Sequence, residues 1–420
     1  MHTLSITEQG IQLHAEGNLL VLMRGKARLR QVRAAEIEQV LLFGRVELTS
    51  GAVALLARRG IDCVWLRQDG RFRARLAMRS SSNVPLRLAQ YRATIDAEFC
   101  ARLARNVVVA KLRYQRQVLL RAQRRLADDD LAVVLGQLRL LMHQAEREAS
   151  LDRLRGFEGQ GAALYFSQFG KLLRVPQFDF THRNRRPPRD PVNACLSFGY
   201  AVLGSLVESQ AQRCGLDPTL GFLHQAAYGR PSLALDVLEE FRPLVDGLVP
   251  RLLNRRQLGP NDFERRSDVS LEEALAGPDV REGATERLEE ESGAAFDDRK
   301  GSGVQGSGFS EEAGESGAAF DDGFDDFAGW AANRDDTLDT SHPANPKSEI
   351  ENPKSPVGVY LAEPGRRIFL SELFRRLRER VYYPPRQAAW ELRDIVRQQL
   401  YHLARVIDGR DADYAPFVPE

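Results

Sequence analysis

The chain has 420 residues, 43% of them hydrophobic and 28% charged, and a formal net charge of +1. This length exceeds what one hydrophobic core normally spans, and the hydrophobic content suffices for more than one core. The longest apolar runs, such as Leu19 to Met23, are too short to cross a bilayer, and the start of the chain lacks the basic and apolar segments of a signal peptide. We therefore expect a soluble, cytoplasmic, multi-domain protein with no membrane partner.

Residues 1–80 predict a small β-rich domain. Short apolar segments between turn signals indicate strands at Leu4–Ile6, Ile11–His14, Leu19–Met23, Ala27–Val32 and Ile37–Leu42. A hairpin that turns at Asp69 and Gly70 is expected to close the domain, with strands at Cys63–Leu66 and Arg71–Leu76. Residues 79–85 are then predicted to form a polar hinge.

One helix is expected to interrupt these strands. It spans Gly51–Arg59, with Ser50 as its cap and with Val53, Leu56 and Ala57 on its buried side.

From Leu86 onward, apolar residues recur along the sequence with the spacing of a helix. Positions three or four residues apart are apolar in two long segments, at Leu103, Val107, Ala110 and Tyr114 and at Leu131, Leu135, Leu138, Met142 and Ala145. Further helices are expected over Arg366–Arg380 and Gln387–Ile407. These segments predict one larger all-α domain, built from residues 86–276 and 357–420. Its aromatic residues favour the core over stacking on DNA bases; they are Tyr165, Phe166, Phe178, Phe180 and Tyr200.

Residues 277–356 have a different composition. They contain 20 acidic and 7 basic side chains, a net charge of −13, so the rest of the chain is at +14. The sequence Glu291–Asp298 recurs as Glu315–Asp322, and glycine and serine are frequent. This pattern predicts a disordered acidic insertion, so the expected fold class is α+β: a small β-rich domain, then an interrupted all-α catalytic domain.

The chain outside residues 277–356 is basic. This charge favours binding to nucleic acid, because basic side chains that neutralise phosphates release counterions. One cluster of arginines lies in a proline-rich loop and is predicted to bind DNA: Arg183, Arg185, Arg186 and Arg189. A second cluster, between Arg102 and Arg125, is equally consistent with a solvated helix face. The four cysteines, Cys63, Cys100, Cys195 and Cys214, have no paired spacing, which argues against disulfides and zinc and predicts buried thiols.

Two short stretches carry candidate metal ligands. Glu158 lies in one, and His224, Asp236 and Glu239 lie in the other. Asp236 and Glu239 are three residues apart and so share a helix face, while Gly229-Arg230-Pro231 separates them from His224 and predicts ligands on separate helices. Carboxylates with one imidazole and no thiolate suit Mg²⁺ or Mn²⁺. Each residue alone is better explained by a structural role.

The motifs together resemble a known family, the CRISPR-associated endonuclease and spacer integrase that is the catalytic "Cas-one" subunit of the adaptation complex. Four blocks in family order carry the resemblance: Gly156–Gly159 with Gly161–Phe166, Arg185–Asn193, Gly221–His224 and Ser232–Pro243. The resemblance is weaker over residues 1–80, resumes at Val359 and is absent from 277–356.

The resemblance implies a metal site at Glu158, His224 and Glu239, with Asp236 as a neighbouring catalytic acid that binds a second ion or orients the first. Arg242, in the last block, joins the DNA-binding set. The expected activity is insertion of short DNA segments into a repeat array, by attack of a DNA 3′-hydroxyl on a phosphodiester. The family also implies a homodimer formed through the β domain, and assembly with prespacer DNA, the repeat and leader, and a small ferredoxin-like subunit, "Cas-two".

Two alternatives remain open from the sequence. A metal-dependent, structure-specific DNA nuclease would use the same residues with water as the nucleophile. A noncatalytic DNA-binding scaffold would need only the basic body. A phosphotyrosine mechanism through Tyr165 or Tyr200 is disfavoured by the metal-ligand set.

Overall fold

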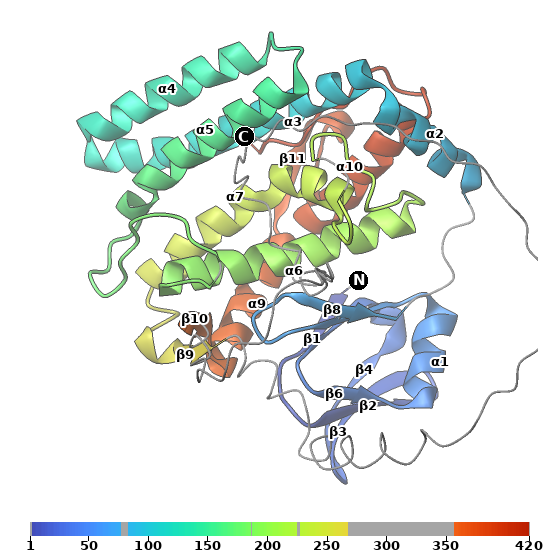
Figure 1. The fold of residues 1–420 in the computed structure, drawn as a ribbon. Helices are drawn as coiled ribbons and strands as arrows, with labels where there is room; N and C mark the ends of the chain where they lie inside the picture. The colour runs from blue at the N-terminus through green and yellow to red at the C-terminus, as the bar shows by residue number, and fades with distance from the viewer. Residues whose placement is uncertain (1, 77–82, 186, 225–226, 268–356, 420) are drawn as a thin grey trace, which may run out of the picture.

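The computed structural model describes residues 2–76, 83–185, 187–224, 227–267 and 357–419, and the predicted insertion at 277–356 therefore lies outside the described residues. A β-rich N-terminal domain lies against a larger helical domain, as predicted (Figure 1). None of the helices in these ranges is both long enough and apolar enough to cross a membrane.

Two four-stranded sheets and one helix make up the N-terminal domain. The first sheet has the order β1-β5-β7-β8 and the second β4-β3-β2-β6. The elements are β1 (His2–Ile6), β2 (Ile11–Glu16), β3 (Leu19–Arg24), β4 (Ala27–Arg33), β5 (Ile37–Phe43), β6 (Val46–Leu48), α1 (Ser50–Arg59), β7 (Asp62–Leu66) and β8 (Phe72–Arg75). All seven predicted strands are present, and β6 is an additional short strand.

Strand β5 contributes side chains to the hydrophobic cores of both domains. Val40 and Leu42 pack into the core between the two sheets and α1, whereas Leu41 and Phe43 pack into the core of the helical domain. Successive side chains of a strand point to opposite faces, so the uninterrupted apolar run of β5 reflects burial on both faces.

Helix α1 begins one residue earlier than predicted. Thr49, not Ser50, is the N-cap, and its side chain accepts a hydrogen bond from the backbone N–H of Ala52 at 3.3 Å. Both residue types cap helices well, so the sequence does not distinguish them. The buried side is also shifted: Ala52, Leu55 and Leu56 are buried and Ala57 is exposed.

The helical domain contains eight long helices among the described residues. They are α2 (Val84–Ile95), α3 (Ala97–Leu126), α4 (Asp129–Ala145), α5 (Leu151–Phe169), α6 (Pro191–Arg213), α7 (Ser232–Asn254), α9 (Glu363–Leu377) and α10 (Leu392–Ile407). Helix α6 lies along the boundary with the β domain (Figure 1). The ion pair between Arg75 of β8 and Glu208 of α6 joins the two domains at 2.5 Å.

Two small antiparallel sheets correct the prediction of an all-α domain. β9 (Phe263–Ser267) pairs with β10 (Val357–Leu361), and β11 (Arg380–Tyr383) pairs with β12 (Ala388–Glu391). Strand β12 occupies residues expected to be helical, so α10 begins at Leu392 and not at Gln387. Aromatic and β-branched residues on both sides of Pro384 and Pro385 favour a hairpin here over a helix.

Helix α7 crosses the centre of the helical domain and is buried along nearly its whole length. It contains two internal prolines, Pro243 and Pro250. A proline has no N–H to bond the carbonyl four residues earlier, so the helical hydrogen bonds to Glu239 and Asp246 are missing.

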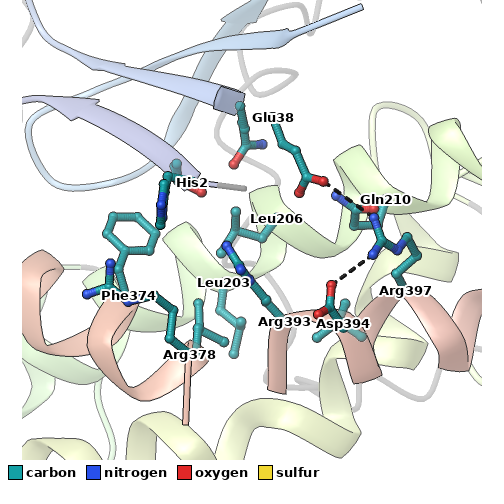
Figure 2. A pocket seen from close by; sticks show the side chains of 14 residues that line it. His2, Glu38, Leu203, Leu206, Gln210, Phe374, Arg378, Arg393, Asp394 and Arg397 are labelled. Carbon is teal, nitrogen blue, oxygen red and sulfur yellow. Dashed lines mark hydrogen bonds and ion pairs between the residues drawn. The ribbon is translucent and has the colours of Figure 1, made fainter. Parts of the chain in front are cut away.

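A cavity of about 80 Å³ lies at the junction of the two domains (Figure 2). His2 and Glu38 of the first sheet face Leu206 of α6 and Arg397 of α10 across it. Arg397 lies 3.4 Å from Glu38 and 2.8 Å from Asp394, so this ion pair joins α10 to β5. The cavity shares no lining residue with the site described below.

Candidate metal and DNA site

Asp236 organises the loop that carries His224. Its Oδ2 accepts hydrogen bonds from the backbone N–H groups of Phe222, at 2.5 Å, and Leu223, at 3.0 Å. Its Oδ1 accepts a hydrogen bond from the backbone N–H of His224, at 3.0 Å. The same oxygen lies 2.5 Å from Nδ1 in the imidazole side chain of His224. Because a carboxylate oxygen can only accept, Nδ1 carries the proton, and Nε2 of a neutral ring then has the lone pair that a metal requires.

This loop approaches the start of α7 very closely. A Cβ at Gly221 would lie 2.7 Å from the backbone of Ser232, so only glycine fits this position. His224 therefore lies in a loop and not on a helix, which corrects the expectation of three ligands from separate helices. Pro231 precedes the first residue of α7, in agreement with the predicted helix start.

Lys111 joins the two glutamates of the candidate metal site. Its Nζ donates a hydrogen bond to Oε1 of Glu158 and lies 2.5 Å from Oε2 of Glu239. Helices α3, α5 and α7 supply one of these three residues each, and all three side chains are buried. Nε of Arg242 lies 3.0 Å from the other carboxylate oxygen of Glu239.

The carboxyl group of Glu239 is ionised in this setting. Burial opposes its ionisation, but the charges of Arg242 and Lys111, and that of His224 when its ring is protonated, outweigh burial and hold the pKa of Glu239 well below the usual range. His224 is therefore close enough to Glu239 to act on its charge, although it comes from a different segment.

Close packing of two helices brings Lys111 and Glu158 together. Gly161, one turn after Glu158 on α5, faces Leu112 of α3, and any side chain at that glycine would collide with Leu112. The motif Gly156–Phe166 therefore supplies both a candidate ligand and the small residue that lets α5 reach α3.

The donor types fit a hard divalent cation such as Mg²⁺ or Mn²⁺, since they are two carboxylates and one imidazole with no thiolate. Glu158 and Glu239 already share one cationic group, which shows that both carboxylates reach the same point. As they stand, no three His, Cys, Asp or Glu side chains in the described ranges converge closely enough to hold a metal, and the ammonium group of Lys111 lies between the two glutamates.

The structure gives Asp236 and Glu239 different surroundings. Among the described residues, Asp236 accepts hydrogen bonds from the loop of His224, whereas Glu239 faces Lys111 and Arg242. This arrangement supports Glu239 as the ligand and Asp236 as the residue that orients the imidazole.

A small cavity of about 30 Å³ opens beside these residues. Lys111 and Glu158 line one part of it, and Arg183, Arg185 and Arg242 line another. Guanidinium groups are suited to binding phosphate. Three of them lie here beside the two carboxylates that share a cation.

The predicted DNA-binding arginines lie in different environments. Arg183 donates to Oδ1 of Asn193 and to Oγ of Ser197, both at 2.9 Å, so internal bonds hold its guanidinium. Arg242 is 6% exposed and packs over the ring of Tyr200 at 4.8 Å. Arg189 is exposed, Arg185 is partly buried, and Arg186 lies outside the described residues.

The aromatic residues of the site belong to the core, as predicted. Tyr165 and Tyr200 are 0% and 2% exposed, and the Tyr200 hydroxyl donates to Oδ1 of Asp246. Burial raises the pKa of both hydroxyls well above the usual range. Neither group is placed or ionised as a nucleophile requires. The four cysteines are likewise buried and unpaired.

Lys111 and Asp246 are site residues that the sequence analysis missed. Lys111 occupies the same helical stripe as Val107 and Tyr114, and a lysine in an apolar stripe is the signal that identifies it. Asp246 lies two turns after Glu239 on α7 and lines the same cavity, and burial raises its pKa to about 6.

Comparison with known proteins assigns the chain to a family. Residues 4–282 match the family model described as CRISPR associated protein Cas1. The chain belongs to the Cas1 family. The resemblance proposed from the four sequence blocks is thereby confirmed.

Curated Cas1 relatives are about 40% identical to this chain. A CRISPR-associated endonuclease Cas1 from Rhodospirillum rubrum is 40% identical over 276 residues, which are 63% of this chain and 79% of the relative. A Cas4 exonuclease/Cas1 endonuclease fusion from Geobacter sulfurreducens is 41% identical over 258 residues, 60% of this chain. The matched part is 46% of that fusion, so the chain spans less than half of it.

Solved structures share the fold at lower identity. A CAS1 protein from Thermotoga maritima superposes with a TM-score of 0.67 at 20% identity and covers 97% of both chains. A casposase bound to an integration product gives a TM-score of 0.68 at 19% identity and covers 100% of this chain and 95% of its own. A Cas6-RT-Cas1–Cas2 complex gives 0.69 at 18% identity, covering 99% of this chain and 36% of the matched one.

Proposed function

We propose that this Cas1-family protein is a metal-dependent DNA endonuclease and integrase that inserts short DNA segments into a CRISPR array by attack of a 3′-hydroxyl on a phosphodiester. One observation carries the proposal: two buried carboxylates, Glu158 and Glu239, share a single cation beside the loop in which Asp236 orients His224. Family membership and the curated relatives named as endonucleases support it.

Glu158, His224 and Glu239 would hold Mg²⁺ or Mn²⁺. When bound, the ion supplies Lewis-acid stabilisation of the charge that develops on phosphate oxygens. Asp236 keeps the proton on Nδ1 of His224, which leaves Nε2 as the donor atom. The burial of Glu158 and Glu239 excludes water from their carboxylates and so strengthens their interaction with a cation.

The arginines of the cavity would position the DNA backbone. Arg185 and Arg242 line the cavity beside the two glutamates and would neutralise the phosphate that reacts. The exposed Arg189 would contact a neighbouring phosphate and so add affinity without base specificity. No protein nucleophile is needed, because the attacking group is the 3′-hydroxyl of the DNA.

The family suggests the partners. The proposed assembly is a homodimer, formed through the β domain, that binds prespacer and repeat DNA with a small ferredoxin-like Cas2 subunit in the cytoplasm. One structural neighbour is a Cas6-RT-Cas1–Cas2 complex, which supports this part of the proposal.

A strand-transfer assay tests the function. The full chain is incubated with a short DNA duplex, supercoiled repeat DNA and Mn²⁺, with or without a chelator. We expect covalently joined products only with Mn²⁺, and complete absence of joined product under all conditions would exclude an integrase.

A structure-specific DNA nuclease is the second candidate, because several curated relatives carry the name endonuclease. It would use the same residues with water as nucleophile. In the same assay it would give cleaved DNA, dependent on Mn²⁺, without joined product.

A further inference from the structure

The position of Lys111 is unusual for a lysine. Its side chain is buried within the helical domain, and its ammonium group contacts one carboxylate from α5 and one from α7. A buried ammonium group is costly unless it is paired, and here two carboxylates pair with it.

We propose that Lys111 is the resident counter-cation of the Glu158 and Glu239 pair: its ammonium group neutralises both carboxylates in the metal-free chain and is displaced when a divalent cation binds. The inference rests on the proposed function, since it takes these two glutamates as metal ligands. It assigns Lys111 the role of a positioning residue that sets metal affinity.

The charge balance of the cluster supports this role. Glu239 also faces Arg242, so it keeps one cationic neighbour without Lys111. Within the described ranges, Lys111 is the only basic residue that forms an ion pair with Glu158. In the metal-free chain without Lys111, Glu158 would therefore be a buried carboxylate beside a second one, which is strongly destabilising.

A metal ion and the lysine compete for the same place. Lys111 lies between the two carboxylates that share it, and a divalent cation on both oxygens would repel an ammonium group that stayed there. The cavity beside it is lined by Lys111 itself and by Asp246, whose carboxyl group is a buried acceptor. The ammonium group can therefore turn away from the glutamates and still keep an acidic neighbour.

The lysine then has two effects on the site. It keeps the glutamates assembled when metal is scarce, and it lowers the affinity for metal, because binding must first displace an ion pair. Replacing Lys111 by an uncharged side chain should separate these effects, since stability without metal should fall while affinity for metal should rise.

Titration of the full-length chain with Mn²⁺ tests the proposal without any DNA. We compare wild type with Lys111→Met, which removes the charge at similar length, after treatment with chelator. Lys171→Met is the matched control, because Lys171 forms an ion pair with Asp128 at 2.6 Å outside the site. The readouts are the Mn²⁺ dissociation constant by calorimetry and the thermal midpoint with chelator and with Mn²⁺.

We expect Lys111→Met to bind Mn²⁺ at least about tenfold more tightly than wild type. In chelator its thermal midpoint should fall by about 4 °C or more, and Mn²⁺ should restore it. The control variant should bind Mn²⁺ as wild type does. If Lys111→Met folds only with Mn²⁺, that result also supports the proposal.

Other outcomes overturn it and separate it from the proposed function. Equal or weaker Mn²⁺ binding by Lys111→Met would exclude displacement of the lysine while leaving the metal site intact. Absence of Mn²⁺ binding by both proteins would overturn the inference together with the metal site itself. If Lys111→Met does not fold with or without Mn²⁺, Lys111→Gln, which keeps a hydrogen-bond donor, takes its place in the same comparison.

Discussion

Glu239 and Glu240 are adjacent in α7, but their carboxylates contact different parts of the molecule. Glu239 faces Lys111 and Arg242 in the candidate site. Glu240 accepts a hydrogen bond from the hydroxyl of Tyr414 and another, at 2.8 Å, from the backbone N–H of Phe417. One helix turn therefore connects the proposed chemistry to the C-terminal segment.

Loss of a proposed metal ligand should stop chemistry without stopping DNA binding. We expect Glu158→Gln, His224→Ala and Glu239→Gln each to reduce strand transfer by at least about a hundredfold, because these residues would serve the transition state. DNA affinity, measured by fluorescence anisotropy at several salt concentrations, should stay within about threefold, because arginines supply it. Retained turnover by the His224→Ala protein would remove His224 from the metal site.

Asp236→Asn tests the orientation of the imidazole. An asparagine oxygen can still accept from the backbone N–H groups of Phe222 and Leu223, but the amide NH2 then takes the place of Oδ1 and cannot accept from Nδ1 of His224. We expect a fall of roughly 10- to 100-fold in Mn²⁺ affinity, as is usual when the partner of a metal-binding histidine is changed. Calorimetry measures it, and unchanged affinity in a folded variant would assign Asp236 a purely structural role.

Glu240 predicts a pH dependence of stability. Burial raises its pKa from the ordinary 4.5 to about 7, against the opposing hydrogen bonds from Tyr414, Phe417 and Gln399. The folded state therefore prefers the protonated form, and the associated stability is complete below pH 4.5 and is lost as the pH rises through 7.

Glu240→Gln should remove this dependence, because an amide can donate to the Tyr414 oxygen and accept from the other two groups. The difference in unfolding free energy between pH 5 and pH 8 should shrink by on the order of 2 kcal/mol relative to wild type. Denaturant titrations at several pH values measure it. An identical pH profile for both proteins would show that folding does not raise the pKa of Glu240.

Arg189 and Arg183 should behave differently when they are changed to alanine. Arg189 is exposed, so its loss should weaken binding to all DNA sequences alike and lower the log-log salt slope by about one unit. Arg183 is held by Asn193 and Ser197, so its loss should lower thermal stability in the absence of DNA. Loss of stability in the Arg189 variant, with an unchanged salt slope, would contradict its assignment as a phosphate contact.

Residues 277–356 should be dispensable for chemistry. Strands β9 and β10 pair antiparallel with Ser267 opposite Val357, so the two ends of the stretch between them are already neighbours. We expect a chain without 277–356 to fold and to transfer strands. Its nonspecific DNA binding should be tighter at low salt, because a charge of −13 is removed, and this difference should fade as salt rises.

An unfolded or inactive deletion protein would mean that this segment belongs to the fold. Limited proteolysis gives an independent check, since cleavage between Arg281 and Arg334 should leave two fragments that remain associated and active.

Regular periodicity made much of the fold predictable. The apolar run of β5 and the helical stripe of α3 both correspond to buried faces. The proposed metal ligands were chosen from the sequence blocks that resemble the family. The separate roles of Asp236 and Glu239 did not, because both are acidic residues on one helix face, and only their neighbours distinguish them.

Contacts between distant segments were beyond sequence reasoning. Lys111 meets Glu158 and Glu239 only after three helices pack together, and no local pattern encodes that meeting. The β9–β10 pair is hidden for a similar reason, since its strands lie on either side of residues 268–356. The hairpin at residues 380–391 was missed because its arginines and alanines also suit a helix.

The two prolines of α7 weaken the helix at the turns that follow Glu239 and Asp246. Each of these turns lacks one backbone hydrogen bond of the helix. The positions of the two acidic residues therefore depend on their packing partners more than on the helix itself. A version of α7 with alanine at both positions would be a better helix. It would also restore the two backbone hydrogen bonds that the carbonyl groups of Glu239 and Asp246 now lack, so this element gives up helix stability next to two residues of the candidate site.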